Sequence, residues 1–149
     1  MIEAESVILR EASPGPFADC ITLDESQRHR RRMAMVSDGG IAFLLNLSQA
    51  RLLRAGDAIV LADGRLIEVR AKPEALYAVR GHDARHLLTL AWHLGNRHLP
   101  AAIEADRILI RRDHVIADMV KGLGGSVEEI EDAFDPAAGA YAQHGHSHD

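Results

Sequence analysis

Nine histidines are spread unevenly along this 149-residue chain, and their positions indicate where it could bind a metal ion. Only His29 lies in the first half of the sequence. The last six residues, HGHSHD, place imidazoles at every second position, at His144, His146 and His148. Imidazole nitrogen is a preferred ligand of divalent nickel, copper and zinc. The residue types therefore predict binding of a transition-metal ion.

Three more histidines, His82, His86 and His93, share one stripe of a helix that the sequence predicts over residues 82–96. The spacing of four between His82 and His86 would let the two side chains clamp a metal ion. The alternative is a solvated polar helix face. No nearby carboxylate or thiol completes a clamp, and the chain has no HExxH motif.

His98 lies in the stretch WHLGNRHLP, on a short connection between a helix end and a strand. Gly95 allows a tight exit from the helix, and Pro100 holds Leu99 extended. The negative end of the helix dipole also favours a cation here. The alternative role for His98 is a hydrogen bond to a loop carbonyl. His114 follows Asp113 at the predicted start of the next helix, where its alternative role is to complete a capping turn.

The elements that carry these histidines follow the order strand, helix, strand, strand, helix, strand. This βαββαβ order is typical of the ferredoxin-like fold. The predicted strands cover residues 74–81, 99–105, 106–112 and 126–134, and the predicted helices cover 82–96 and 113–125. We expect Leu87, Leu88, Ala91 and Leu94 on the inner face of the first helix, and Ile116, Met119, Val120 and Leu123 on that of the second.

The first seventy residues predict β structure instead. Two pairs of apolar runs flank SDGG and ADGR, which are hairpin signals. We expect a small barrel or a pair of packed sheets, with one helical turn at residues 48–53. The fold class is therefore α+β, with an N-terminal all-β domain over residues 1–72, a ferredoxin-like domain over 73–135 and a flexible tail over 136–149.

Composition excludes several classes of protein. With 47% apolar residues, 26% charged residues and a net charge of −5, the chain is globular and not a dedicated nucleic-acid binder. No apolar run is long enough for a membrane helix, and no signal peptide is evident. The single cysteine, Cys20, cannot form an internal disulfide and fits the reducing cytoplasm. The basic run over residues 28–32 suits an acidic protein partner.

Three motifs in this order, WHLGNRHLP, RRDHVIADMVKGLGG and FDPAAGAYA, followed by a histidine-bearing C-terminus, resemble the UreE family of urease accessory proteins. Members of that family are nickel metallochaperones. The resemblance implies a homodimer with a partner-binding N-terminal domain and a metal-binding C-terminal domain. It makes His98 the principal nickel ligand and His114 a further metal-binding residue. Arg112 stands where some members carry a second histidine, and the tail is shorter than in many members.

The resemblance therefore implies a protein that carries Ni2+ as cargo for assembly of the urease active site. A two-fold axis would bring His98 of both subunits to one ion. The tail histidines, His144, His146 and His148, would act as a tethered ligand arm. The partners that the resemblance implies are a second copy of the chain, the urease accessory GTPase and the urease apoprotein–accessory complex.

Two alternatives to the nickel carrier stay open. One is a general histidine-based buffer of divalent metals, because imidazole sites also take Zn2+ or Cu2+ in vitro. The other is a protein-interaction module with an incidental tail. Catalysis is not expected, because the chain lacks a three-ligand metal motif with an adjacent carboxylate base, a nucleophile elbow and a phosphate loop.

Overall fold

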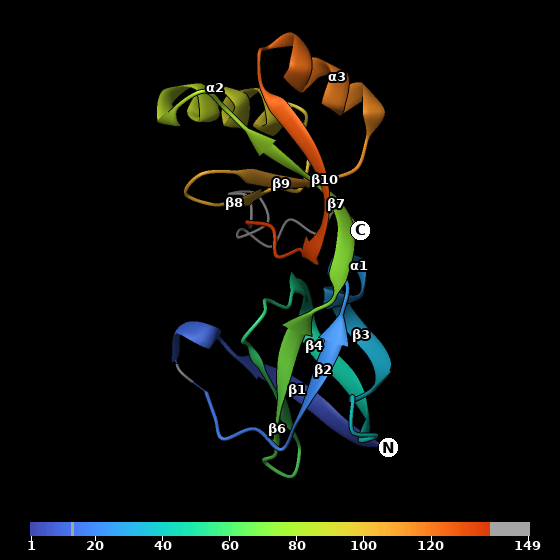
Figure 1. Ribbon diagram of the computed structural model, residues 1–149. Coiled ribbons are helices and arrows are strands. Elements are labelled where there is room, and N and C mark those ends of the chain that lie inside the picture. The colour runs from blue at the N-terminus through green and yellow to red at the C-terminus, as the bar shows by residue number, and fades with distance from the viewer. Residues whose placement is uncertain (13, 138–149) are drawn as a thin grey trace. The chain divides into compact units, whose positions relative to one another are not determined.

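The computed structural model describes residues 1–12 and 14–137. These residues form two compact units, Met1–Lys72 and Pro73–Ala137 (Figure 1). The first unit is all β apart from two short helical turns, and the second is α+β. The predicted fold class, an all-β domain followed by a ferredoxin-like domain, is confirmed. No helix in the described ranges is long and apolar enough to cross a membrane.

The first unit is one six-stranded mixed sheet with a buried apolar core. Its strand order is β2-β6-β5-β1-β4-β3, so β2 and β3 are the edges. The strands are β1 (Ile2–Ile8), β2 (Asp19–Leu23), β3 (His29–Val36), β4 (Ala42–Leu52), β5 (Ala58–Leu61) and β6 (Leu66–Ala71), with short helices η1 (Arg10–Ala12) and α1 (Glu25–Arg28).

Both predicted hairpins are present: β3 pairs with β4 and β5 with β6, each antiparallel. The expected helical turn at residues 48–53 is wrong, because β4 continues to Leu52. There Leu52 pairs with His29, and Arg51 pairs with Arg30. Pairing with the start of β3 outweighs the local helical preference of this stretch.

The sheet curls so that its β2 edge meets the turn between β3 and β4. Ser37 donates a hydrogen bond from its hydroxyl to Asp19 at 2.5 Å, and Thr22 donates one to Asp38 at 2.6 Å. The backbone N–H of Asp38 also bonds the carbonyl of Cys20. The Ser37 hydroxyl lowers the pKa of Asp19, and the Thr22 hydroxyl lowers that of Asp38. These bonds fasten the edge strand to the turn.

The basic run over residues 28–32 is not a uniform surface patch. Arg28 is fully buried, and its guanidinium donates to the carbonyls of Leu23 and Leu53. Arg31 and Arg32 are exposed on edge strand β3. Of the basic run expected to suit an acidic partner, Arg28 is not available at the surface, because its guanidinium is buried and bonded to these backbone carbonyls.

The second unit is a four-stranded antiparallel sheet in the order β10-β7-β9-β8, with both helices on one face (Figure 1). This order and the βαββαβ sequence of elements are those of the ferredoxin-like fold. The elements are β7 (Pro73–Arg80), α2 (Ala84–Gly95), β8 (Ala102–Ile103), β9 (Ile108–Arg111), α3 (His114–Gly122) and β10 (Ser126–Ala133).

Helix α2 buries Leu87, Leu90 and Leu94 against the sheet. The expectation that Leu88 faces the core is wrong, since its side chain is 71% exposed. At about 100° per residue, Leu88 lies a quarter turn from Leu87 and shares a second stripe with Trp92, one turn later. Trp92 is also exposed, at 66%.

Helix α3 begins at the predicted cap, where the Asp113 carboxylate accepts hydrogen bonds from two backbone N–H groups of the first turn. It buries Ile116, Ala117 and Val120. Leu123, expected in the core, lies just past the helix end and is 36% exposed. The helix ends where Gly124 takes a φ of +85°, a conformation suited to glycine.

Candidate metal centre

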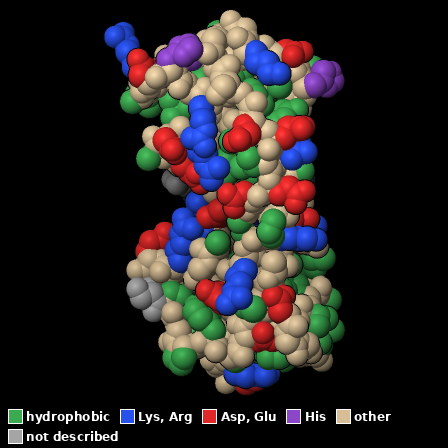
Figure 2. Space-filling model, viewed as in Figure 1, with side chains coloured by type: hydrophobic (Ala, Val, Ile, Leu, Met, Phe, Trp, Pro, Cys, Tyr) green, Lys and Arg blue, Asp and Glu red, His purple; other side chains and the backbone are tan. Residues whose placement is uncertain are grey.

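The pairing of the strands brings three connections to one end of the second unit. Residue Ala102, which begins β8, pairs with Leu109, and β9 ends two residues later. The connection that carries His98 and the start of α3 at His114 therefore lie at the same end of the sheet. Strand β10 also ends there, because Ala133 pairs with Pro73 at the start of β7. Figure 2 shows histidine side chains on the surface over the helical layer of this unit.

His98 has an unusual backbone conformation. Its φ is +57°, and it is the one described non-glycine residue with positive φ. Its backbone N–H donates to the carbonyl of Gly95 at 3.0 Å, so the chain turns tightly after the helix. The side chain is exposed. Backbone strain at a non-glycine residue is often found where a side chain must be aimed at a ligand.

His114 is the first residue of α3 and is exposed. The carboxylate of Asp113 caps the helix beside it. The capping is complete without the imidazole, since Asp113 accepts the N–H groups of Val115 and Ile116. The capping-turn role considered for His114 is therefore filled by the aspartate.

Arg112, at the position where a second family histidine was considered, is held by the sheet. Its guanidinium donates to the carbonyls of Leu76 at 3.2 Å and Ile130 at 3.0 Å. It also lies 3.7 Å from a carboxylate oxygen of Glu129. This residue stabilises the junction of β7 and β10.

The His82–His86 pair is a structural contact in this fold. Its rings stack with centroids 4.5 Å apart. The backbone N–H of His82 donates to Nδ1 of His86 at 2.9 Å. Nε2 of His86 therefore carries the proton and donates to the carbonyl of Leu123, also at 2.9 Å. Both ring nitrogens of His86 are occupied, so a metal clamp would have to break two hydrogen bonds.

The start of the C-terminal segment lies beside the His98 connection. The backbone N–H of Ala137 donates to the carbonyl of Ala101 at 3.0 Å, three residues after His98. The expected tail ligands, His144, His146 and His148, lie outside the described residues. Within residues 1–12 and 14–137, no three His, Cys, Asp or Glu side chains are grouped closely enough to hold a metal ion.

Sequence reasoning missed two features of this region. Leu88 and Trp92 on α2 and Val115 on α3 are large apolar residues exposed on the helical layer. The spacing of four between Leu88 and Trp92 was a visible signal of a second apolar stripe. The positive φ of His98 had no such signal beyond the glycine that precedes it by three residues.

Comparison with known proteins identifies relatives over almost the whole chain. Residues 6–72 match the family described as "UreE urease accessory protein, N-terminal domain", and residues 74–149 match the corresponding C-terminal domain. A urease accessory protein UreE from a Chelativorans species is 65% identical over 133 residues, covering 87% of this chain and 84% of the relative.

Two other proteins of the same name extend the comparison. The one from Rhodopseudomonas palustris is 59% identical over 142 residues, which cover 95% of this chain and 66% of that longer protein. The one from Brucella anthropi is 48% identical over 149 residues, covering 100% of this chain and 84% of the relative.

Proposed function

The chain belongs to the UreE family of urease accessory proteins, and from that premise we propose that it is a nickel metallochaperone. It binds Ni2+ and delivers the ion for assembly of the urease active site. The observation that carries this proposal is the placement of His98, exposed and in a strained conformation, at the end of the unit where His114 also lies.

His98 is proposed as the principal ligand because the fold presents it at low entropic cost. Its φ of +57° and the bond to Gly95 fix the backbone before any metal arrives. A prearranged ligand loses less conformational freedom on binding than a mobile one. Nickel accepts imidazole nitrogen and can complete its coordination with water or carboxylate oxygen.

A homodimer is proposed because a single exposed imidazole binds a metal ion weakly. A two-fold axis would bring the same imidazole from a second subunit to the ion and so double the number of ligands. The exposed apolar side chains of Leu88 and Trp92 suit burial against a second copy, as does Val115 beside His114. These residues lie on the helical layer, on elements that begin or end near the two histidines. In the dimer, His98 of each subunit contributes to one ion.

The tail histidines are proposed as auxiliary ligands. His144 is seven residues beyond Ala137, whose position is fixed beside Ala101. Seven residues span at most roughly 25 Å, so the tail histidines can approach His98 of the same chain. A tether of this length raises the local imidazole concentration to about the millimolar range.

The first unit is proposed to bind partner proteins of the urease assembly machinery, among them the urease accessory GTPase and the urease apoprotein–accessory complex. Exposed Arg31 and Arg32 on edge strand β3 would meet an acidic surface. The lone thiol of Cys20 suits assembly in a reducing cytoplasm.

Nickel transfer tests this function directly. Purified metal-loaded protein is mixed with urease apoprotein and the other accessory proteins while free nickel is held low by a chelator. The proposal predicts active urease with the wild-type chain and little with His98→Ala. A general metal buffer would give equal activation by both proteins, or none by either.

A further inference from the structure

The chain does not leave the second unit where β10 ends. Residues 134–137, here called the strap, follow Ala133, which pairs with β7 at the β10 edge of the sheet. The strap ends at Ala137, whose N–H bonds Ala101, the residue directly before β8 at the opposite edge. Figure 1 shows this last coloured segment running from the foot of β10 towards β8 and β9. The strap therefore crosses the sheet.

Burial along the strap alternates as expected for an extended segment lying on a sheet. Phe134 and Pro136 are buried, Asp135 is half-buried and Ala137 is exposed. Pro136 restricts Asp135 to extended conformations. Phe134 is 0% exposed and belongs to a cluster on the sheet face opposite the helices, with Leu76, Ala78, Ala102 and Leu109.

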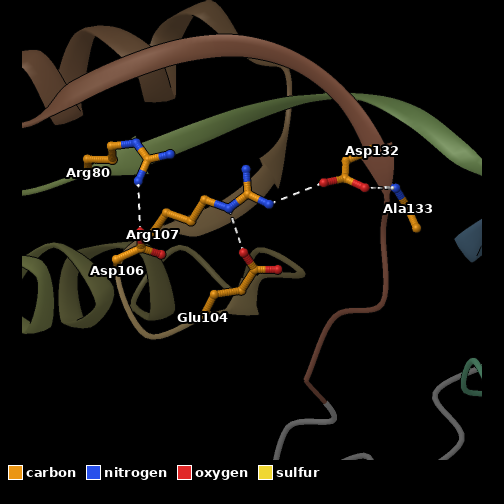
Figure 3. Close-up of polar contacts among 6 residues, drawn as sticks. All are labelled: Arg80, Glu104, Asp106, Arg107, Asp132 and Ala133. Atoms are coloured by element: carbon orange, nitrogen blue, oxygen red, sulfur yellow. Dashed lines mark hydrogen bonds and ion pairs between the residues drawn. The ribbon is translucent and has the colours of Figure 1, made fainter.

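Cationic side chains fasten the same face. The guanidinium of Arg111 lies 5.5 Å from the centre of the Phe134 ring, within cation–π range. The guanidinium of Arg107 donates one hydrogen bond to the carboxylate of Glu104 and another, at 3.2 Å, to the carboxylate of Asp132 (Figure 3). Asp132 lies two residues before the strap. The bond to Glu104 is the main cause that raises the pKa of Arg107. Arg107 thus ties the β8–β9 turn to the end of β10.

We propose that the strap positions the C-terminal histidine segment at the His98 end of the unit, with Phe134 as its anchor. This inference rests on the proposed function, in which the tail histidines supplement His98. Phe134 is a positioning residue: it touches no metal and acts by fixing where the tail begins.

The size of the effect follows from chain length. With the strap in place, seven residues separate the fixed Ala137 from His144. If the strap detaches, the fixed point retreats to Ala133 and the separation becomes eleven residues. Effective concentration falls with about the −3/2 power of tether length, which gives roughly a twofold loss. The fixed point from which the tail starts also moves across three strand spacings, about 14 Å, away from His98. This move lowers the effective concentration of the tail imidazoles at His98 further.

The test needs no metal, so its outcome is independent of the proposed function. Trp92 on α2 is the single tryptophan of the chain and serves as an energy-transfer donor. A fluorescent acceptor is attached to Ala142→Cys in a Cys20→Ser background, which removes the native thiol. Transfer is measured in the full-length protein.

Two matched pairs of substitutions decide the result. Phe134→Ala with Ala137→Pro removes the anchor and the N–H donor, whereas Phe134→Leu with Ala137→Gly keeps an apolar anchor and the donor. We expect the first pair to lower and broaden the transfer, and the second pair to retain it. Equal transfer in both pairs, with circular dichroism showing both folded, overturns the proposal. If the double variant Phe134→Ala with Ala137→Pro does not fold, the single variants Ala137→Pro and Ala137→Gly are compared instead. Equal energy transfer in these two variants would likewise overturn the proposal.

A nickel titration separates this inference from the proposed function. We expect the first pair to lower nickel uptake in the full chain but to have no effect once the chain is truncated after Ala142. Equal losses in both backgrounds would show that the strap acts through the fold and not through the tail, and would overturn the inference. If truncation alone changes no nickel binding, the tail role in the proposed function fails, whatever the transfer measurement gives.

Discussion

The backbone N–H of Ala137 donates a 3.0 Å hydrogen bond to the carbonyl of Ala101. This bond joins the start of the C-terminal segment to the connection that carries His98. The C-terminal segment therefore starts beside the residue that the family resemblance makes the principal ligand, which is where the proposed function needs it.

Truncation after Ala142 removes all three tail histidines and is expected to keep the dimer and the His98 site. The number of nickel ions bound should fall, while affinity at the tight site should change by no more than about tenfold, or about 1.4 kcal/mol. Holding tail residues at the metal would cost conformational entropy, which offsets much of what their imidazoles contribute. Calorimetric titration of both chains measures this. Complete loss of the tight site on truncation would make the tail a primary ligand.

His98→Gly and His98→Ala should separate ligand loss from backbone strain. Both remove the imidazole and should abolish the tight nickel site. Glycine adopts a φ of +57° without a side-chain clash, whereas alanine does not. We expect the free energy of unfolding of the glycine variant, measured by urea denaturation, to exceed that of the alanine variant by about 1 kcal/mol. Equal stability of the two would show that the positive φ carries no strain.

His86→Leu should destabilise the second unit without affecting the nickel site. The substitution leaves the Leu123 carbonyl and the His82 N–H without their partner, at a cost of about 1–2 kcal/mol. His82→Ala keeps both bonds and removes only the stacked ring, so it serves as the control. Urea unfolding and nickel titration of both variants test this. A drop in nickel stoichiometry in either variant would restore the metal-clamp interpretation.

Arg32→Glu should weaken binding to an acidic partner of the first unit. Arg32 is exposed on edge strand β3, so the reversal meets the partner with like charge. Arg65→Glu makes the same charge change in the turn between β5 and β6 and is the control. We expect about a tenfold weaker complex, or about 1.4 kcal/mol, for Arg32→Glu alone. Equal effects of the two variants would indicate a general charge effect and no docking site at β3.

The parts of the fold that were predictable are those with local causes. The Asp-Gly turns, the cap at Asp113 and the glycine after α3 each leave a short-range signal. These signals give the βαββαβ order and both hairpins. The helical turn expected at residues 48–53 is absent because this stretch extends the β3–β4 hairpin and pairs with the start of β3.

Details of the candidate site and of the expected partner surface depended on tertiary contacts that no spacing reveals. The buried position of Arg28 follows from carbonyls more than twenty residues away or across a helix turn. The sequence left two roles open for His86, because a spacing of four is common to metal clamps and to stacked rings. Leu88 was predicted in the core because it follows Leu87, and apolar residues at adjacent positions can face either side of a helix.

The central claim is that His98 from two subunits holds one nickel ion. Calorimetric nickel titration of the purified dimer, with its mass checked by light scattering, tests it most directly when run beside His98→Ala. We predict about one tightly bound Ni2+ per dimer in the wild-type chain. The tight site should be lost in the variant while the dimer remains. A tight site of unchanged affinity in His98→Ala, or one tight ion on an isolated monomer, would contradict the claim.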